Sequence, residues 1–335
     1  MKKVFLPLLL ISSLIITAQP KKINVPRLDV KQVEEWVNYL ASDEMIGRRN
    51  GTPEMENAAK WIAGQFKKAG LKEFPRIKGY LQNYFIKRSK TDSIPERNVI
   101  GYIEGSDPAL KNEYIVLTAH FDHVGYRKGV KPDSIFNGAN DNASGTCALI
   151  GIANTLKMMK AKPKRTLIFA AVSGEEMGMR GSRYFVSNSP VPINSVYLNM
   201  NFEMLGHCKV LGEKRYQITG PMMTNLKEIL HDYNKESEWK LIDTVKNLAG
   251  LFYASDNAAF ASIKREGSTN FGIPGHTFVT HNGEDHIHKP NDEAKYFNFT
   301  NYRDFIGYAS GLTMYLAGCR EKIEWKDSKF LRIKN

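Results

Sequence analysis

Five side chains that could bind a metal ion recur along this sequence, and they carry its clearest chemical signal. They are His120, Asp141, Glu176, Glu203 and His288. Three of them, His120, Glu176 and Glu203, closely follow apolar, strand-like runs, and the carboxyl ends of parallel strands are where such a sheet opens its active site. Imidazole and carboxylate groups in this arrangement predict a hydrolase that uses two metal ions.

The first candidate ligand ends a predicted strand. The apolar run from Tyr114 leads directly to His120, and Asp122 follows two positions later. The Asp122 carboxylate could accept a hydrogen bond from the second ring nitrogen of His120, which would fix the tautomer of a metal-binding imidazole. For His120 taken alone, a core histidine with a satisfied N–H is the alternative.

Asp141 lies in the run GANDNASG, residues 138–145, just before a predicted helix. Its carboxylate has two oxygens, so it could bridge two metal ions held about 3.5 to 4 Å apart. An N-cap of the following helix is an equally good explanation from the sequence alone.

Glu175 and Glu176 are adjacent carboxylates that follow a fully apolar strand. They would repel one another unless a cation compensates or one of them is protonated. Because neighbouring side chains in extended backbone point opposite ways, one could coordinate metal while the other acts as a general base. A solvated loop pair is the alternative.

The last two candidates are less specific. Glu203 follows the apolar run Val196 to Met200, and a solvated loop glutamate would look the same. His288 lies in the run DHIHKPND, residues 285–292, where His281 and His286 are rivals. The residue types alone do not choose among these three histidines.

Strand-like and helical patterns alternate around these residues. Apolar residues at helical spacing predict two helices within residues 29–69, separated by a loop at 47–52. Strands are predicted at 98–103, 114–119, 166–172 and 196–200, and helices at 145–160 and 297–316. This alternation predicts an α/β fold of three layers (α/β/α) with a mostly parallel, mixed central sheet. We expect a single domain, because the candidate ligands run from position 120 to 288.

The N-terminus has the layout of a secretory signal. Lys2 and Lys3 precede an apolar run from Val4 to Ile16, and small residues follow up to Ala18. The run is shorter than the roughly 20 residues of a transmembrane helix. We expect residues 1–19 to be a signal peptide, with export to the periplasm or extracellular space and no stable membrane insertion after cleavage. An uncleaved N-terminal anchor is the alternative.

Charge and cysteine content favour an ordinary solvated surface. The formal net charge is +12, with 47 Lys and Arg against 35 Asp and Glu, and it falls to about +10 without the two N-terminal lysines. The basic residues are scattered and lack interleaved aromatics, so no nucleic-acid partner is expected. Three cysteines, Cys147, Cys208 and Cys319, form no complete disulfide framework, and we expect free or buried thiols.

Taken together, the motifs resemble those of metallopeptidase family twenty-eight, the co-catalytic zinc aminopeptidases. Five family motifs occur in order and at similar intervals, as HFDHVG (120–125), GANDNASG (138–145), GEEMG (174–178), NFEMLG (201–206) and HKPND (288–292). The likeness covers roughly residues 30–315 and includes the segments 45–52 and 97–101. It implies the zinc exopeptidase fold.

The resemblance also implies a ligand set. One zinc ion would be held by His120 and Glu203, a second by Glu176 and His288, and Asp141 would bridge the two. This choice prefers His288 because it precedes Lys-Pro at the matching place. Zinc itself is an implication of the family, since these ligand types accept other divalent ions.

Further roles follow from the same resemblance. Glu175 would be the general base, and Asp122 would orient His120. The peptide bond between Asp141 and Asn142 would be cis.

The sequence departs from the family pattern in three places. Glu203 stands where many members have Asp, and Ser255-Asp256-Asn257 replaces Ser-Asp-His. Extra residues from Ile263 to Asn270 are expected to border the substrate pocket. The substrate-binding residues, the preferred terminal residue and the oligomeric state are not predicted.

The predicted function is that of an exported, zinc-dependent exopeptidase, best matched to an aminopeptidase that acts on peptides with two zinc ions per chain. A glutaminyl cyclase-like acyltransferase with one zinc, a zinc carboxypeptidase and a non-catalytic domain are the alternatives. The predicted organisation is a signal peptide at 1–19, a zinc peptidase domain at 25–320 and a charged C-terminal tail at 321–335.

Overall fold

The computed structural model describes residues 24–131, 133–243, 248–263, 272–280 and 286–326, and every structural statement below concerns these residues. The predicted signal peptide at 1–19 lies outside them. So do His281, most of the 263–270 loop and the last part of the predicted tail.

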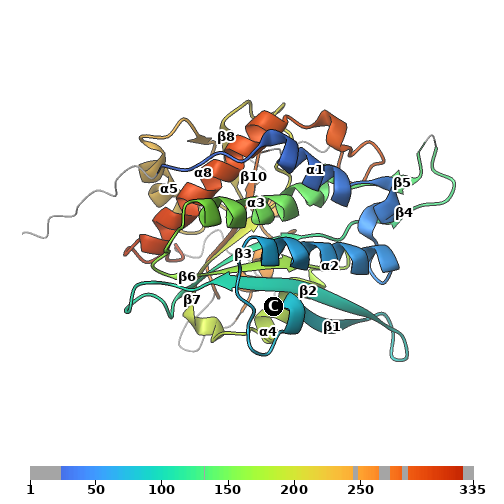
Figure 1. Cartoon of the computed structure of the whole chain (residues 1–335), viewed down its shortest axis with the longest axis horizontal. Helices are drawn as coiled ribbons and strands as arrows, with labels where there is room; N and C mark the ends of the chain where they lie inside the picture. Colours follow the sequence, from blue (N-terminus) through green and yellow to red (C-terminus); the bar gives the residue numbers. More distant parts are fainter. Residues whose placement is uncertain (1–23, 132, 244–247, 264–271, 281–285, 327–335) are drawn as a thin grey trace, which may run out of the picture.

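Eight strands of the described chain form one mixed sheet (Figure 1). In spatial order they are β1 (Leu81–Lys87), β2 (Ser93–Ile103), β6 (Thr166–Val172), β3 (Tyr114–His120), β7 (Val196–Phe202), β10 (Gly275–Val279), β8 (Arg215–Ile218) and β9 (Lys240–Leu241). The four central strands β6, β3, β7 and β10 run parallel to one another, whereas β2 pairs antiparallel with β6 and β8 pairs antiparallel with β10. The mixed, centrally parallel sheet confirms the predicted fold class.

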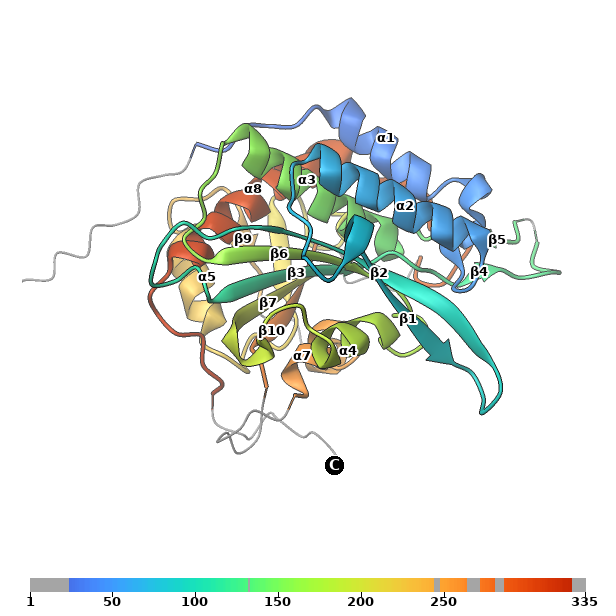
Figure 2. The same cartoon turned by 60° about the horizontal axis from the view of Figure 1, so that its bottom comes forward.

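Helices cover both faces of this sheet (Figure 2). One face carries α1 (Val30–Leu40), α2 (Pro53–Lys68), α3 (Ser144–Met158) and α8 (Phe299–Gly318), and the opposite face carries α4 (Arg180–Ser187) and α7 (Asn257–Ala261). Strand β6 shows why both layers are needed. Leu167 and Phe169 join the core beneath the first group of helices, whereas Ile168 and Ala170 join the core beneath the second. A strand buried on both faces requires a continuous apolar run, and that is what the sequence has there.

The remaining elements are short. They are α5 (Leu226–Asn234), α6 (Leu248–Leu251), the hairpin of β4 (Gly125–Tyr126) and β5 (Ile135–Phe136), and the single turns η1 (Asp43–Arg48), η2 (Lys78–Tyr80), η3 (Ala139–Ala143), η4 (Ile193–Ser195) and η5 (Ala294–Tyr296). No helix among the described residues is long and apolar enough to cross a membrane. All three cysteines are free, as predicted, and Cys147 is buried.

The first residues of the predicted tail run along the domain. Ile323 is buried, and the indole N–H of Trp325 donates a hydrogen bond to the backbone oxygen of Gly272. The segment 321–326 also contacts the start of α5, where the backbone N–H of Glu324 donates to the side chain of Asn225.

Candidate metal centre

The candidate residues meet because three neighbouring strands are parallel. His120 is the last residue of β3, Glu203 directly follows β7, and the loop after β6 carries Glu175 and Glu176. Since β6, β3 and β7 are adjacent in the sheet, their carboxyl ends open at the same edge.

Asp141 is brought to this edge by a tightly held turn before α3. The backbone N–H groups of Asn140 and Asp141 donate to the two carboxylate oxygens of Asp292, at 2.8 and 2.9 Å. The side-chain oxygen of Asn142 accepts from the backbone N–H of Gly145 at 2.9 Å and so serves the helix terminus. Asp141 makes no such bond, which rules out the N-cap explanation. The peptide bond between Asp141 and Asn142 is cis, as the resemblance implies.

The first group of possible ligands consists of His120, Asp141 and Glu203, whose donor atoms all lie within 4.8 Å of one another. Nε2 of His120 is 3.3 Å from Oδ1 of Asp141, and the imidazole is fully buried. Nε2 has no hydrogen-bond partner among the described residues. Buried polar atoms are usually hydrogen-bonded, so the open nitrogen favours a metal ligand over a core histidine kept for packing.

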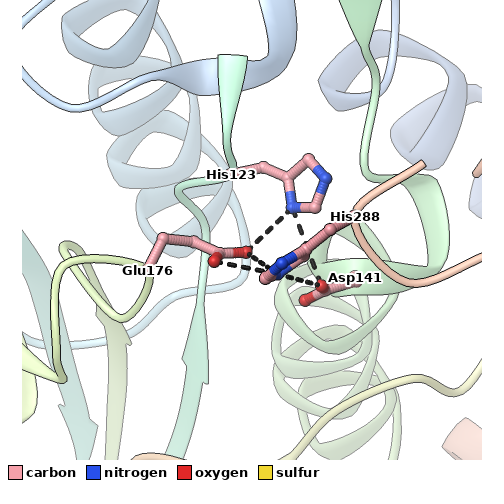
Figure 3. Close-up of side chains that lie close together, drawn as sticks. All are labelled: His123, Asp141, Glu176 and His288. Carbon is pink, nitrogen blue, oxygen red and sulfur yellow. Dashed lines mark hydrogen bonds and ion pairs between the residues drawn. The ribbon is translucent and has the colours of Figure 1, made fainter. Parts of the chain in front are cut away.

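The second group of possible ligands, drawn in Figure 3, shares Asp141 with the first. Nε2 of His288 is 2.9 Å from the carboxylate of Glu176 and 3.3 Å from Oδ2 of Asp141. His123 completes the group, with Nδ1 3.1 Å from Oε1 of Glu176. Thus Oδ1 of Asp141 faces the first group, and Oδ2 faces the second.

The structure separates the rival histidines of the last motif. Nδ1 of His286 lies 3.0 Å from the backbone oxygen of Asn291, and its ring packs against His207 and Tyr296. His288 is the one that reaches Glu176, whereas His281 lies outside the described residues.

Asp122 contacts His120 differently from the expectation. Nδ1 of His120 is 3.2 Å from the backbone oxygen of Asp122 but 3.8 Å from its carboxylate. The carboxylate instead accepts from the backbone N–H groups of Glu175 and Glu176, at 3.1 and 3.2 Å. Asp122 thereby positions His120 with its backbone and the glutamate pair with its side chain.

The carboxyl groups at this edge are costly to keep charged in the bare protein. Burial raises the pKa of Asp122 to about 7, of Glu203 to about 7 and of Glu175 to about 10, and acidic neighbours add to each shift while His120 opposes it. Burial would also raise the pKa of Asp141, but His120 and His288 hold it well below its usual range. Bound cations would relieve this crowding of negative charge.

The donor set fits divalent ions. Buried imidazole nitrogens without hydrogen-bond partners face carboxylate oxygens, and these are ligand types that zinc takes in proteins. The residues would serve two ions, one on each side of Asp141.

Sequence reasoning missed three contributors to this centre. His123 and Asp292 stand inside the first and last of the five motifs, which was the signal available for them. Ser255 lies in a segment noted only as a departure, and its hydroxyl donates a hydrogen bond to the carboxylate of Glu203. That bond steadies the longer glutamate side chain.

The model of Peptidase family M28 matches residues 98–311 of this chain. A protein named "Probable zinc metalloprotease" from Pyrenophora teres f. teres is 31% identical over 190 residues, which is 54% of this chain and 38% of that protein. A protein named "Glutamate carboxypeptidase 2 homolog" from Caenorhabditis elegans is 37% identical over 112 residues, which is 31% of this chain and 13% of that protein. The match thus covers less than half the length of either relative.

Among solved structures, that of a zinc aminopeptidase from Bacillus subtilis superposes with a TM-score of 0.66. The alignment covers 88% of this chain and 96% of that chain, at 15% sequence identity. At this identity the likeness shows a shared fold.

Proposed function

The chain belongs to peptidase family M28, and we propose that it is a zinc-dependent aminopeptidase that removes N-terminal residues from peptides. The observation that carries the proposal is the placement of Asp141, whose two carboxylate oxygens face two separate groups of possible ligands. A shared carboxylate could hold two ions at the separation of about 3.5 to 4 Å that two-metal hydrolases use.

The proposed ligand set assigns two zinc ions to each chain. His120 and Glu203 would hold one ion, Glu176 and His288 would hold the other, and Asp141 would bind both. When bound, divalent ions supply Lewis acidity, which makes water easier to deprotonate and a peptide carbonyl easier to attack.

Glu175 would act as the proton carrier. Its carboxylate would take a proton from the attacking water and pass it to the leaving amine. In the metal-free protein, burial and the nearby carboxylates of Asp256, Glu203 and Asp122 raise its pKa to about 10, although His120 opposes the shift. Bound cations would lower that pKa again and so favour the ionised form that a general base needs. The Asp122 carboxylate, bound to the backbone of Glu175, would keep the base in place.

Activity assays test whether the enzyme cleaves peptides from the amino or the carboxyl terminus. We expect the zinc-loaded chain to hydrolyse aminoacyl amides with a free α-amino group, and a chelator to abolish the reaction. Cleavage of N-blocked substrates with a free carboxylate would favour the carboxypeptidase alternative. Cyclisation of N-terminal Gln with one zinc per chain would favour the cyclase.

Export is a separate part of the proposal. The basic start and short apolar run of residues 1–19 support a cleaved signal peptide and a periplasmic or extracellular location. N-terminal sequencing of the protein after expression with its native leader should find a mature start close to residue 20. An intact Met1 on the accumulated protein would contradict it.

A further inference from the structure

We propose that His123 is a fourth protein ligand of the ion held by Asp141, Glu176 and His288, so that the two metal positions of this chain differ in kind. One position would be closed by four protein ligands, and the other would keep three, from His120, Asp141 and Glu203. This inference rests on the proposed two-metal site and adds a ligand to it.

The spacing of the four donor atoms is that of a tetrahedral site. Nδ1 of His123 lies 3.1 Å from Glu176 and 3.8 Å from Asp141, and Nε2 of His288 lies 2.9 and 3.3 Å from the same two carboxylates. Zinc bonds of about 2.0 to 2.2 Å in a tetrahedron place neighbouring donors about 3.4 Å apart. The observed separations scatter around that value, and all four donors lie within 4.8 Å of one another.

A plain hydrogen bond does not account for the position of His123. Although Nδ1 is close to Oε1 of Glu176, neither ring nitrogen of His123 makes a hydrogen bond within the described structure. A ring nitrogen that accepts would meet two carboxylates and be repelled. Donor atoms that converge on a cation between them, rather than on each other, explain both the short distance and the missing hydrogen bond.

The ring of His123 is also held in this orientation. Its side chain is fully buried, and its backbone N–H donates to the backbone oxygen of Arg48 at 3.2 Å. Gly138, at φ +57°, packs directly against the ring, because a Cβ at that position would lie 2.4 Å from Cγ of His123. The imidazole therefore has one defined pose, with Nδ1 toward Glu176 and Asp141 (Figure 3).

A difference in ligand number has a consequence for the order of filling. Zinc sites with four protein ligands are closed, whereas sites with three keep a position for water or substrate. The first equivalent of zinc should therefore occupy the position that contains His123. The second should fill the three-ligand position and be the first to leave to a chelator.

The test uses His123→Asn in the full-length chain. The amide nitrogen of Asn takes roughly the place of Nδ1, so it keeps a hydrogen-bond donor but removes the imidazole ligand. In chelator competition the affinity for the tighter of the two zinc ions should fall by more than about 100-fold, because loss of an outer contact alone typically costs 10- to 100-fold. His286→Asn, a change in the same loop as His288 but outside the cluster, should leave both affinities unchanged.

A loss of about 100-fold or less in His123→Asn would overturn the inference, since the histidine would then act as an outer contact or none. If the variant fails to fold, X-ray absorption on the wild-type chain with one equivalent of zinc decides. Outer-shell scattering from two imidazoles is expected, and scattering from one would contradict us. Both experiments are done without substrate. The inference about His123 can therefore fail while the aminopeptidase proposal stands, and the aminopeptidase proposal can fail while the inference stands.

Discussion

Glu175 and Glu176 are neighbours in the chain, but their carboxylates face different partners. Glu176 reaches His123 and His288, whereas the charge of Glu175 interacts chiefly with His120 and with other acidic groups. Both backbone amides are bound by the carboxylate of Asp122. The pair is thus fixed so that one glutamate can bind metal and the other can carry a proton.

Glu175→Gln tests this division. The substitution keeps the shape and removes the proton acceptor, so kcat should fall by about 10² to 10⁴ while zinc content stays at two per chain. Steady-state kinetics and metal analysis measure the two effects. Glu54→Gln, on the first turn of α2, is the matched control and should leave both unchanged. Wild-type turnover in Glu175→Gln would show that another group carries the proton.

At this scale the sequence predicted residue types better than contacts. His120, Asp141, Glu176 and Glu203 were found from local patterns, whereas His288 was chosen over two rival histidines only by the family resemblance. The structure brings the donor atoms of these residues together in two groups. The contribution of His123 was missed, and so were the hydrogen bonds from the backbone before α3 to the Asp292 carboxylate. Both depend on how distant loops meet. A single sequence does not contain that packing.

At the scale of elements, one buried arginine ties together the segments that carry the ligands. The guanidinium of Arg48, in η1, donates to the backbone oxygens of Phe121, Asn137 and Gly138 at 2.7 to 2.8 Å, and also to that of Leu40. The first of these oxygens, that of Phe121, lies directly after the strand that ends at His120, and those of Asn137 and Gly138 lie just before the turn that carries Asp141.

Arg48→Met should therefore weaken both the fold and the site. Several buried carbonyl groups would lose their donor, at about 1 to 3 kcal/mol for each unsatisfied group, so we expect at least about 3 kcal/mol loss in the free energy of unfolding and weaker zinc binding. Urea unfolding measures the loss in the free energy of unfolding. Arg49→Met, at the exposed neighbouring position, should change stability by no more than about 0.5 kcal/mol. Equal stabilities of the two variants would refute this role.

A second element-level prediction concerns pH. His276 on β10 is fully buried, with its ring nitrogens 2.8 Å from Oγ1 of Thr224 and 2.7 Å from the backbone oxygen of Thr219. Burial lowers its pKa to about 4, and the bond to Thr219 opposes that shift only in part. The native state thus binds fewer protons than the unfolded state between about pH 4 and 6.5.

Stability should consequently fall as the pH drops through that window, by on the order of 2 kcal/mol at about pH 5 from this residue alone. His276→Gln does not titrate there, so its unfolding free energy should fall less between about pH 7.5 and pH 5. Urea unfolding of both proteins with a chelator present measures the difference. Identical pH dependence would mean that His276 is protonated as easily in the native state as in the unfolded chain.

The central strands β3, β6 and β7 were predicted from their apolar runs, whereas the buried strand β10 and the strands β1, β8 and β9 toward the edges were not. β6 is apolar throughout and buried at every position. β1 alternates in burial but not in residue type, because the polar Gln82 is buried while the apolar Phe85 is 68% exposed. β8 and β9 are only four and two residues long, too short for a periodic pattern.

At the scale of the whole molecule, the site draws on residues from β3 to the segment before α8. The single domain that we predict at 25–320 would unfold as one cooperative unit. We expect one unfolding transition on heating, with a midpoint that rises when zinc is added, because ions that bind the native state stabilise it. Differential scanning calorimetry with and without a chelator measures this. Two separated transitions would indicate independent domains.

The central claim, a two-zinc aminopeptidase built around Asp141, is tested most directly by mass spectrometry of a peptide mixture after incubation with the zinc-loaded chain. The peptides would have the same sequence after the first residue and differ only in that residue, and one of them would begin with Gln. Our account predicts loss of the N-terminal residue, which reaches its maximum at two equivalents of zinc and is abolished in Asp141→Ala. Shortening from the carboxyl end, or loss of ammonia from the Gln peptide alone with one zinc bound, would contradict it.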